Sequence, residues 1–507
     1  MKDVICLDSL ASQGEEVISQ KLLSLKREEF PVGYSLEVEY NSDIINNQNY
    51  PGKFLTTFVK LISEIDIPSF FVKIKSSYKN INRDLDYLAN IYKNGKIDYY
   101  NSEVKFVFQV ENNINNTFCI LPWFHFYFNP QGNVLPCCTA DEKITLGSYV
   151  TKDFDFNNKK IKEFRRSLLN NIEVPHCNSC YKIEKNNLQS PRQRFNKVFK
   201  NKINKDLKET VDQFKLTYLD IRLSNVCNLK CRMCSGKFSN RIAQEDYEIW
   251  GSSEYIQSSN FLNIDEYFLD IIKENVNYLE KIYFAGGEPL INPVHYKILK
   301  LLEENNKTDL NLFYNTNFSI LNYKKDSVID YWKKFSDVII GASIDLLGPA
   351  SNYVRNGIDY NTLENNYFIL KDNCPNVKFT ISSVLSLFNV FNLCDLQKHW
   401  VIKNQLPANC LNFNVLHNPE EMSLKCLPAE YKHRAAEKIH KHIDYLKEIN
   451  NATHLVKKWN TAIDFMFSED HSYMLKKFFT INDERDKFRN QKFEDYFPEY
   501  KNLRSHI

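Results

Sequence analysis

The feature that most constrains the fold is an alternation of short apolar segments with amphipathic segments between about residues 214 and 420. The apolar segments have the length and composition of buried strands, and segments with helical spacing, such as Tyr296–Leu302 and Leu393–Ile402, separate them. Six such units predict a parallel α/β arrangement, either an open barrel or a doubly wound sheet. The predicted strands are Leu216–Leu223, Lys281–Phe284, Leu310–Tyr314, Val338–Ile344, Val377–Val384 and Leu411–Leu416.

The length of the chain indicates more than one domain, because 507 residues exceed an ordinary single domain. Residues 1–112 alternate strand-like with helix-like segments, which predicts a small α/β domain whose role the sequence does not indicate. We expect three further domains: a cysteine-rich module over 113–200, the alternating core over 214–425 and a helical extension over 426–507. The elements predicted outside the core are strands at Tyr34–Tyr40 and Ser69–Ile74 and helices at Lys53–Ile65, Ile81–Tyr92, Glu430–Tyr445 and Tyr473–Phe479.

Composition and charge argue against several classes of protein. Apolar residues make up 43% of the chain and charged residues 25%, which is the balance of a soluble globular protein. The formal net charge of +2 provides no field that favours nucleic acid or an acidic membrane surface. Asp3, Asp8 and Glu15 interrupt any apolar N-terminal segment, and no stretch reaches the roughly 18 apolar residues of a membrane span. We therefore expect a cytoplasmic protein with no membrane partner and no nucleic-acid partner.

The distribution of the 13 cysteines is more informative than their number, because eight of them fall into close groups. In a reducing compartment such groups indicate metal binding more often than disulfide bonds. The grouped cysteines are Cys119, Cys137, Cys138, Cys177, Cys180, Cys227, Cys231 and Cys234. The other five are scattered along the chain, and we expect them to behave as small buried hydrophobes.

The densest group, Cys227, Cys231 and Cys234, directly follows the first predicted strand of the core. Loops at the C-terminal ends of parallel strands are where such folds place their active sites. Three thiolates on one short loop can hold three irons of a cubane cluster and leave the fourth iron open to bind and reduce a substrate. The alternative is zinc, but structural zinc takes four ligands, and no fourth cysteine or histidine is near this loop in the sequence.

The spacing of Cys227, Cys231 and Cys234 after a first strand resembles that of the radical S-adenosylmethionine (radical SAM) superfamily. The resemblance implies a partial (β/α)6 TIM-like barrel, a catalytic [4Fe–4S] cluster and S-adenosylmethionine bound to its open iron. It further implies reductive cleavage to methionine and a 5′-deoxyadenosyl radical that abstracts hydrogen from a substrate. Met233 stands where the superfamily commonly has an aromatic residue, and it keeps an apolar contact for the adenine.

Motifs at the ends of later strands extend this resemblance. Ala285–Pro289 contains the sole adjacent glycine pair of the chain and resembles the superfamily motif Gly-Gly-Glu-Pro, which contacts the ammonium group of S-adenosylmethionine. Arg355 resembles the basic residue that pairs with the methionine carboxylate, since a guanidinium suits that anion. The residues that the resemblance assigns to S-adenosylmethionine are Met233, Gly286, Gly287, Glu288, Asn315, Ser343, Asp345 and Arg355.

A second group of cysteines precedes the core. Cys119, Cys137, Cys177 and Cys180 supply four thiolates, which suffice for one complete iron–sulfur cluster. A pair spaced like Cys177 and Cys180 is equally a zinc signature, so the residues alone leave iron–sulfur and zinc open.

Three segments around these cysteines, Cys119–Trp123, Gly132–Cys138 and His176–Tyr181, resemble the SPASM/twitch auxiliary-cluster module. The resemblance implies an auxiliary [4Fe–4S] cluster, and the spacing after Gly132 selects Cys137 as a ligand, with Cys138 as the alternative. Here the module precedes the core instead of following it, and its cysteines suffice for one cluster and not for two.

We therefore expect a radical SAM oxidoreductase that oxidises or crosslinks a peptide or protein side chain, with the auxiliary cluster as an electron relay. It would need an external electron donor similar to flavodoxin or ferredoxin. One alternative is the dehydrogenation or rearrangement of a small sugar- or nucleotide-like molecule. The non-enzymatic alternative is a zinc-stabilised binding protein. Catalytic side chains beyond the cofactor ligands cannot be assigned, because the cofactor carries the difficult chemistry.

Overall fold

The structure is a computed structural model of the whole chain, and its contacts divide the chain into two units, residues 1–116 and residues 117–507. The structure describes five strands of the first unit. It describes the second unit except for residues 151–153, 186–188, 203–210, 212–213, 223, 252–264 and 450–451.

The described part of the first unit is one five-stranded sheet in the order β1-β2-β3-β5-β4. Strands β1, β2 and β3 are parallel, and β5 and β4 continue the sheet in antiparallel pairing. The predicted strands near residues 34 and 69 are present as β2 and β3, whereas both predicted helices of this region lie outside the described residues. The strands are β1 (Lys2–Cys6), β2 (Ser35–Asn41), β3 (Phe70–Lys75), β4 (Lys96–Tyr100) and β5 (Glu103–Phe108).

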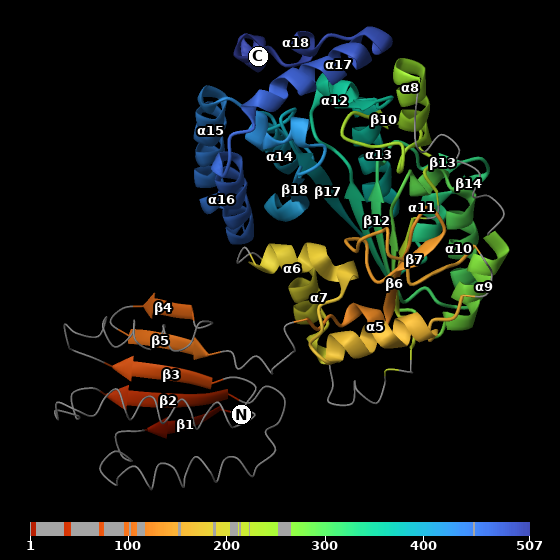
Figure 1. Cartoon of the computed structure of the whole chain (residues 1–507), viewed down its shortest axis with the longest axis vertical. Helices are drawn as coiled ribbons and strands as arrows, with labels where there is room; N and C mark the ends of the chain where they lie inside the picture. Colours follow the sequence, from red (N-terminus) through yellow and green to blue (C-terminus); the bar gives the residue numbers. More distant parts are fainter. Residues whose placement is uncertain are drawn as a thin grey trace. The chain divides into compact units, whose positions relative to one another are not determined.

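The second unit is built on a nine-stranded sheet in the order β18-β17-β15-β12-β11-β9-β6-β7-β8 (Figure 1). From β6 to β18 neighbouring strands are parallel, and only β7 and β8 at one edge are antiparallel. The strands are β6 (His125–Phe128), β7 (Asn133–Leu135), β8 (Gly147–Ser148), β9 (Tyr218–Ile221), β11 (Lys281–Phe284), β12 (Asn311–Thr316), β15 (Asp337–Ala342), β17 (Val377–Leu385) and β18 (Leu411–Val415).

The strand order decides between the two predicted architectures. A doubly wound sheet reverses its order at a switch point. Here β9, β11, β12, β15, β17 and β18 follow one another in chain order without a reversal, as in a barrel that stays open. All six strands that the sequence predicts are present within a few residues of their predicted bounds. The cysteine-rich segment is joined to the same sheet, because its strand β6 pairs with β9 in parallel.

Helices cover one face of the sheet between successive strands (Figure 1). Phe284 of β11 stacks edge-on against His295, and Tyr314 of β12 meets Trp332 in the same way. The helices that follow the parallel strands are α8 (Asn240–Trp250), α9 (Asp265–Asn275), α10 (Pro293–Glu304), α11 (Val328–Trp332), α12 (Gly348–Val354), α13 (Tyr360–Asn373) and α14 (Leu393–Ile402). Helices α5 (Lys159–Leu169), α6 (Asn178–Lys185) and α7 (Pro191–Val198) belong to the cysteine-rich segment.

Helix ends in the core follow local sequence signals. Ser239 caps α8 by accepting a hydrogen bond from the Ile242 backbone N–H, and Gly251 ends that helix in the left-handed region with φ +74°. Asn292 caps α10 in the same way, directly before Pro293 at the first helical position. These signals fix where each helix leaves the sheet edge, and so they fix the positions of the loops between them.

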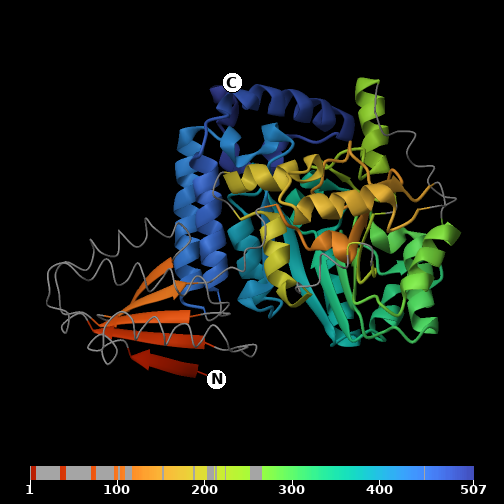
Figure 2. The same cartoon turned by 60° about the horizontal axis from the view of Figure 1, so that its bottom comes forward.

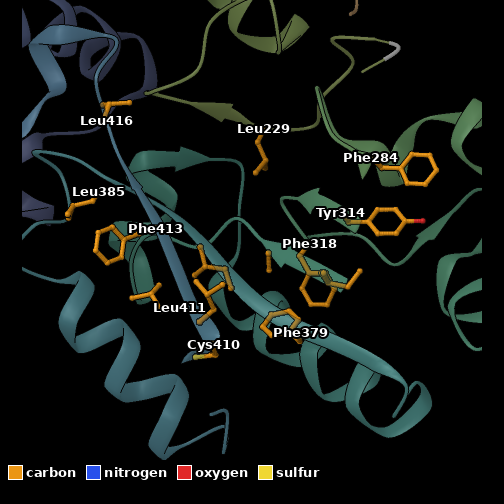
Figure 3. Close-up of a cluster of buried hydrophobic side chains, with 14 of the residues drawn as sticks. Leu229, Phe284, Tyr314, Phe318, Phe379, Leu385, Cys410, Leu411, Phe413 and Leu416 are labelled. Carbon is orange, nitrogen blue, oxygen red and sulfur yellow. The ribbon is translucent and has the colours of Figure 1, made fainter. Parts of the chain in front are cut away.

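The core lies between the sheet and its helices, and apolar residues far apart in the chain meet there (Figure 3). Four of the five scattered cysteines, Cys374, Cys394, Cys410 and Cys426, are buried in it, as expected for small hydrophobes. The side chain of the fifth, Cys6, lies outside what the structure describes. The apolar side chains that the figure labels come from the core strands and the segments after them: Leu229, Phe284, Tyr314, Phe318, Phe379, Leu385, Leu411, Phe413 and Leu416.

After residue 428 the described part of the chain contains four α-helices, with short 3-10 helices between and after them. Helices α15 (Ala429–Lys447) and α16 (Thr453–Phe467) lie side by side (Figure 2), as their mutual contacts require. Helix α17 (Leu475–Arg489) and the short α18 (Phe493–Tyr496) lie next to α12 and α8 (Figure 1). Among the described residues, none of the helices has the length and apolar character needed to span a membrane.

Candidate functional site

The loop after β9 carries the three closely spaced cysteines. Within it, the two-residue strand β10 (Lys230–Cys231) pairs in antiparallel fashion with β16 (Arg355–Asn356). Cys231 is the direct partner of Arg355 in this ribbon, and the Arg355 Nη1 atom lies 3.7 Å from the Cys231 sulfur. The Asn240 side chain at the start of α8 accepts a hydrogen bond of 2.9 Å from the Cys227 backbone N–H. The loop is therefore held from both sides by core elements.

The three thiols of this loop are close enough to influence one another. Burial, and then the neighbouring Cys231, raises the pKa of Cys227. Burial, followed by Cys231, raises the pKa of Cys234 to about 12. Burial raises the pKa of Cys231 too, but Arg355 opposes that shift. A raised thiol pKa disfavours the thiolate, and bound irons would favour it, because they are cations that bind thiolates.

The glycine pair after β11 forms a tight turn against this loop. Gly286 and Gly287 both have positive φ, +76° and +53°. A Cβ atom on Gly287 would lie 2.4 Å from the backbone oxygen of Val226, and one on Gly286 would lie 2.6 Å from the Arg222 side chain. Only glycine fits both the conformation and the space. The pair thus brings the turn directly against the start of the cysteine loop.

Glu288 is buried behind this turn and receives three hydrogen bonds. The Thr316 hydroxyl and the Asn317 backbone N–H each donate to its carboxylate at 2.6 Å, and the Leu290 backbone N–H donates at 3.0 Å. Burial nevertheless raises the pKa of Glu288 to about 7, although the three hydrogen bonds work in the opposite direction. A nearby cation would favour the charged form of this carboxyl group.

Other predicted S-adenosylmethionine contacts lie at the same edge of the sheet. Arg355 forms a buried ion pair with Asp345, with its Nε atom 2.6 Å from the carboxylate. The Ser343 backbone N–H donates to the Thr316 carbonyl and thereby joins the ends of β15 and β12. The side-chain oxygen of Asn315 is buried and has no hydrogen-bond partner among the described residues, so it remains available for a ligand. Met233 is partly buried against the core.

The second group of cysteines comes together from three short segments. Cys119 precedes the short helix η2 (Leu121–Trp123), Cys177 ends η3 (Pro175–Cys177), and Cys180 lies in α6. Burial, and then Cys177, Cys137 and Cys180, raises the pKa of the Cys119 thiol well above its usual value. Cys137 is influenced in turn by Cys177 and Cys180 after its own burial, which raises its pKa to about 12. The structure therefore brings the four predicted thiols together.

Cys138 has different neighbours. Burial, and then the Asp220 carboxylate, raises the pKa of its thiol to about 12, and Cys138 hydrogen-bonds with Asp220. Arg222 also lies near Cys138, and its guanidinium carbon is 4.9 Å from the centre of the Tyr127 ring. Cys137 therefore faces the other cysteines, whereas Cys138 faces a buried group of polar residues.

That polar group was not anticipated from the sequence. Tyr127, Asp220 and Tyr283 are direct partners on three neighbouring strands, so their side chains share one face of the sheet. Asp220 and Tyr127 are buried, and burial raises the pKa of Asp220 to about 6. A charged residue buried in a short core strand is unusual. Asp220, with Arg222 two residues later, was therefore the sequence feature that could have indicated this polar group. Arg222 also lies against the Gly286 turn, so this group connects Cys138 with the turn beside the cysteine loop.

Known protein families match both cysteine-containing segments. The iron–sulfur cluster-binding SPASM domain matches residues 119–181, and the Radical SAM superfamily matches residues 221–398. The chain carries a radical SAM domain. Its SPASM domain precedes the radical SAM domain, in the order that the sequence predicts.

Several curated proteins are similar to the chain over part of its length. It is 30% identical over 194 residues to the radical SAM cyclopropyl synthase TigE of Paramaledivibacter caminithermalis. The matched region covers 36% of this chain and 38% of TigE. It is 29% identical over 119 residues to a GTP 3′,8-cyclase of Campylobacter jejuni, covering 23% of this chain and 33% of that enzyme. The chain thus spans little more than a third of the length of these relatives.

Solved structures show a weaker likeness. One is anSMEcpe with bound AdoMet and Cp18Cys peptide, with 18% identity and a TM-score of 0.31 over 46% of this chain and 60% of that one. Another is Streptococcus suis SuiB bound to S-adenosylmethionine, with 17% identity and a TM-score of 0.29 over 66% of this chain and 70% of that one. Similarities this weak carry no argument about function.

The two domains imply S-adenosylmethionine, a [4Fe–4S] cluster and an auxiliary iron–sulfur cluster. By number, the donor sets suit these groups, because three thiols leave one iron of a cubane without a protein ligand and four thiols complete a cluster. In the described part of the chain, however, no three His, Cys, Asp or Glu side chains are arranged to hold a metal ion. The Gly286–Glu288 turn and Arg355 lie beside the first set, where a ligand of the free iron would bind.

Proposed function

We propose that the chain is an enzyme that reductively cleaves S-adenosylmethionine and uses the resulting 5′-deoxyadenosyl radical to oxidise or crosslink a substrate. The single observation that carries this proposal is the meeting of three elements at one sheet edge. The thiols of Cys227, Cys231 and Cys234, the Gly286–Glu288 turn and the Asp345–Arg355 ion pair lie together there. The match of residues 221–398 to the Radical SAM superfamily supports the same reading.

The residues of this edge have separate tasks in the proposal. Cys227, Cys231 and Cys234 would hold the catalytic cluster, and that cluster would supply an electron for cleavage of a carbon–sulfur bond of S-adenosylmethionine. Glu288, fixed by its three hydrogen bonds, accepts the ammonium group of the methionine portion. Arg355, oriented by Asp345, faces the methionine carboxylate and the Cys231 sulfur. Asn315, Ser343 and Met233 line the remainder of the site.

For the auxiliary cluster we propose Cys119, Cys137, Cys177 and Cys180 as ligands, because these four thiols influence one another directly. Four protein ligands leave no iron open to bind the substrate. The cluster could then serve as an electron relay or as a structural element, and we propose the relay. A cluster held by these four residues would supply a one-electron acceptor, so that hydrogen abstraction would lead to an oxidised or newly bonded product.

Two substrate classes have specific support. The SPASM match and the resemblance to SPASM/twitch modules favour a peptide or protein side chain. The partial identity to GTP 3′,8-cyclase favours a nucleotide-like small molecule instead. Deuterium transfer distinguishes the two classes, because label from a deuterated peptide library or from a deuterated nucleotide appears in 5′-deoxyadenosine only when that molecule is the substrate.

The ligand assignment is tested by reconstituting the full-length protein anaerobically and recording electron paramagnetic resonance spectra after reduction. We expect about eight irons per chain and a signal that changes when S-adenosylmethionine is added. The Cys231→Ala variant should lose that change and keep the auxiliary cluster. A colourless, zinc-containing preparation would instead support the zinc-stabilised binding protein, and a response that persists in Cys231→Ala would refute the assignment.

A further inference from the structure

Helices α17 and α18 pack beside the elements that flank the cysteine loop and Arg355 (Figure 1). Helix α17 contacts α8, which follows the cysteine loop in the chain. Helix α18 contacts α12, which ends at Val354, directly before Arg355. Both strands of the β10–β16 ribbon are therefore next in the chain to an element that α17 or α18 contacts.

The Asp486 carboxylate in α17 is buried and connects three separate segments. It accepts hydrogen bonds from the Arg232 guanidinium, from the Tyr353 hydroxyl at 3.1 Å and from the Phe493 backbone N–H at 2.9 Å. Arg232 lies in the cysteine loop, Tyr353 lies near the end of α12, and Phe493 begins α18. One carboxylate thus joins the cysteine loop to the segment that leads into Arg355.

Arg232 joins the same two segments by direct contacts of its own, and its side chain is fully buried. Its backbone N–H donates to the Val354 carbonyl at 2.8 Å, and its Nε atom donates to the Tyr353 carbonyl at 2.8 Å. Its guanidinium carbon lies 3.7 Å from the centre of the Tyr353 ring. Because Arg232 directly follows Cys231 and Val354 directly precedes Arg355, these contacts hold the two ends of the ribbon together.

Helix α17 also holds the loop on both sides of Cys231. The Asn482 side chain accepts a hydrogen bond of 3.0 Å from Arg232, the residue after Cys231. Arg489 donates at 2.9 Å to the carbonyl of Lys230, the residue before Cys231. The position of Cys231 is therefore tied to this helix through both of its neighbours in the chain.

The β10–β16 ribbon is too short to set its own register. Each strand has two residues, and a two-stranded ribbon without further support is at most marginally stable. A slip of one residue in such a pair would also turn each side chain to the opposite face. The pairing of Cys231 with Arg355 therefore depends on the contacts that Asp486 and Arg232 make beside it.

We propose that Asp486 is a positioning residue for S-adenosylmethionine: through Arg232 and Tyr353 it holds Arg355 opposite Cys231 and thereby raises the affinity for the ligand. This inference rests on the proposed function, in which Cys231 binds the catalytic cluster and Arg355 faces the methionine carboxylate. A guanidinium that is held in place before binding loses less freedom when the carboxylate arrives, so affinity falls when the support is removed. A role confined to packing would lower the free energy of unfolding and leave the dissociation constant of the folded protein unchanged.

The test measures the dissociation constant of S-adenosylmethionine for the reconstituted full-length protein, from the change in the electron paramagnetic resonance signal as the ligand is titrated. Asp486→Asn keeps the size of the side chain but removes its charge, and we expect the dissociation constant to rise about tenfold. Tyr353→Phe removes one hydrogen bond and keeps the ring beside Arg232, and we expect a rise of about threefold. Asp483→Asn is the control on the same helix, because Asp483 pairs with the partly exposed Arg504 and should leave the constant unchanged.

A double-mutant cycle with Arg355→Lys shows whether Asp486 acts through Arg355. Arg355→Lys keeps a positive charge but lacks the guanidinium, and in its background Asp486→Asn should cause little further rise, because residues that act together have non-additive effects. A wild-type dissociation constant in Asp486→Asn at full iron content, or additive rises in the cycle, would overturn the proposal. If Asp486→Asn does not fold, the same cycle with Tyr353→Phe decides.

Cys231→Ala distinguishes a failure of this proposal from a failure of the proposed function. If the cysteine loop does not hold the catalytic cluster, Cys231→Ala responds to S-adenosylmethionine as the wild type does. If only the role of Asp486 is wrong, Cys231→Ala still loses the response, while Asp486→Asn binds S-adenosylmethionine as tightly as the wild type.

Discussion

Arg355 lies directly opposite Cys231 in the β10–β16 ribbon, and its guanidinium reaches both the Cys231 sulfur at 3.7 Å and the Asp345 carboxylate at 2.6 Å. One side chain thus connects the cysteine loop with the end of β15. The guanidinium is therefore already oriented before any ligand binds. A carboxylate that enters this site meets a fixed cation instead of a mobile one, which reduces the ordering that binding must impose.

The Gly286–Gly287 turn provides a first prediction. Gly287→Ala should destabilise the protein by about 2 to 3 kcal/mol and weaken S-adenosylmethionine binding, because the new Cβ atom meets backbone oxygens of the cysteine loop in addition to the strain of positive φ. Gly348→Ala is the matched control, since Gly348 has φ +56° and no atom within 4 Å of the Cβ position. It should cost about 1 to 2 kcal/mol, from backbone strain alone. Urea unfolding measures both, and equal losses would contradict the packing argument.

Glu288 predicts a specific dependence of stability on pH. Its pKa is raised to about 7 in the folded protein, so the folded state holds a proton that the unfolded chain has released above about pH 4.5. Stability should therefore fall as pH rises from about 4.5 to about 7, by up to about 3 kcal/mol from this group in the absence of S-adenosylmethionine. Glu288→Gln lacks the titrating proton. The difference in unfolding free energy between wild type and variant should change between pH 5 and pH 8, and a constant difference would argue against the shift.

The two adjacent cysteines of the SPASM domain should differ in their effect on iron content. Cys137→Ser should lose the auxiliary cluster, leaving about four irons per chain, because Cys137 faces Cys177 and Cys180. Cys138→Ser should keep about eight irons, because its thiol faces Asp220 and Arg222 instead. Iron and sulfide analysis of the two purified variants makes the comparison. The reverse pattern would assign the ligand to Cys138.

Replacing the buried Arg232 should strongly lower the free energy of unfolding. Arg232→Met leaves the Asp486 carboxylate buried without its cation, which should cost about 3 to 5 kcal/mol of unfolding free energy. Arg504 is the control, since it pairs with Asp483 and Glu494 but its side chain is 42% exposed. Arg504→Gln should cost at most about 1 kcal/mol. Comparable losses in the two variants would show that burial of the Arg232 pair is not what matters.

The core of the fold could be predicted from the sequence because each strand is a short segment rich in apolar residues between segments with helical spacing. In β11, β12 and β17 buried side chains alternate with less buried ones. The strand from Lys281 to Phe284 and the helix from Leu393 to Ile402 have the predicted bounds. The choice between an open barrel and a doubly wound sheet depended on which strands are neighbours, and that order is a property of long-range pairing. Periodicity along the chain does not report it.

The cysteines and the glycine turn could also be predicted, since their spacing reflects local chemistry. The polar residues around them could not. Arg489 lies 259 residues from Lys230, whose carbonyl it contacts, and nothing in its local sequence distinguishes it from a solvent-exposed arginine on a charged helix. The pairing of β6 with β9, which makes the sheet continuous, could not be predicted either, because the two segments lie about 90 residues apart in the sequence.

The central claim is that the cysteine loop holds the cluster that cleaves S-adenosylmethionine, and quantifying 5′-deoxyadenosine tests it most directly. Anaerobically reconstituted protein is reduced with dithionite in the presence of S-adenosylmethionine, and Cys231→Ala and Cys138→Ser are treated identically. The account predicts 5′-deoxyadenosine from the wild type and from Cys138→Ser and none from Cys231→Ala. Equal amounts from the wild type and Cys231→Ala would contradict it.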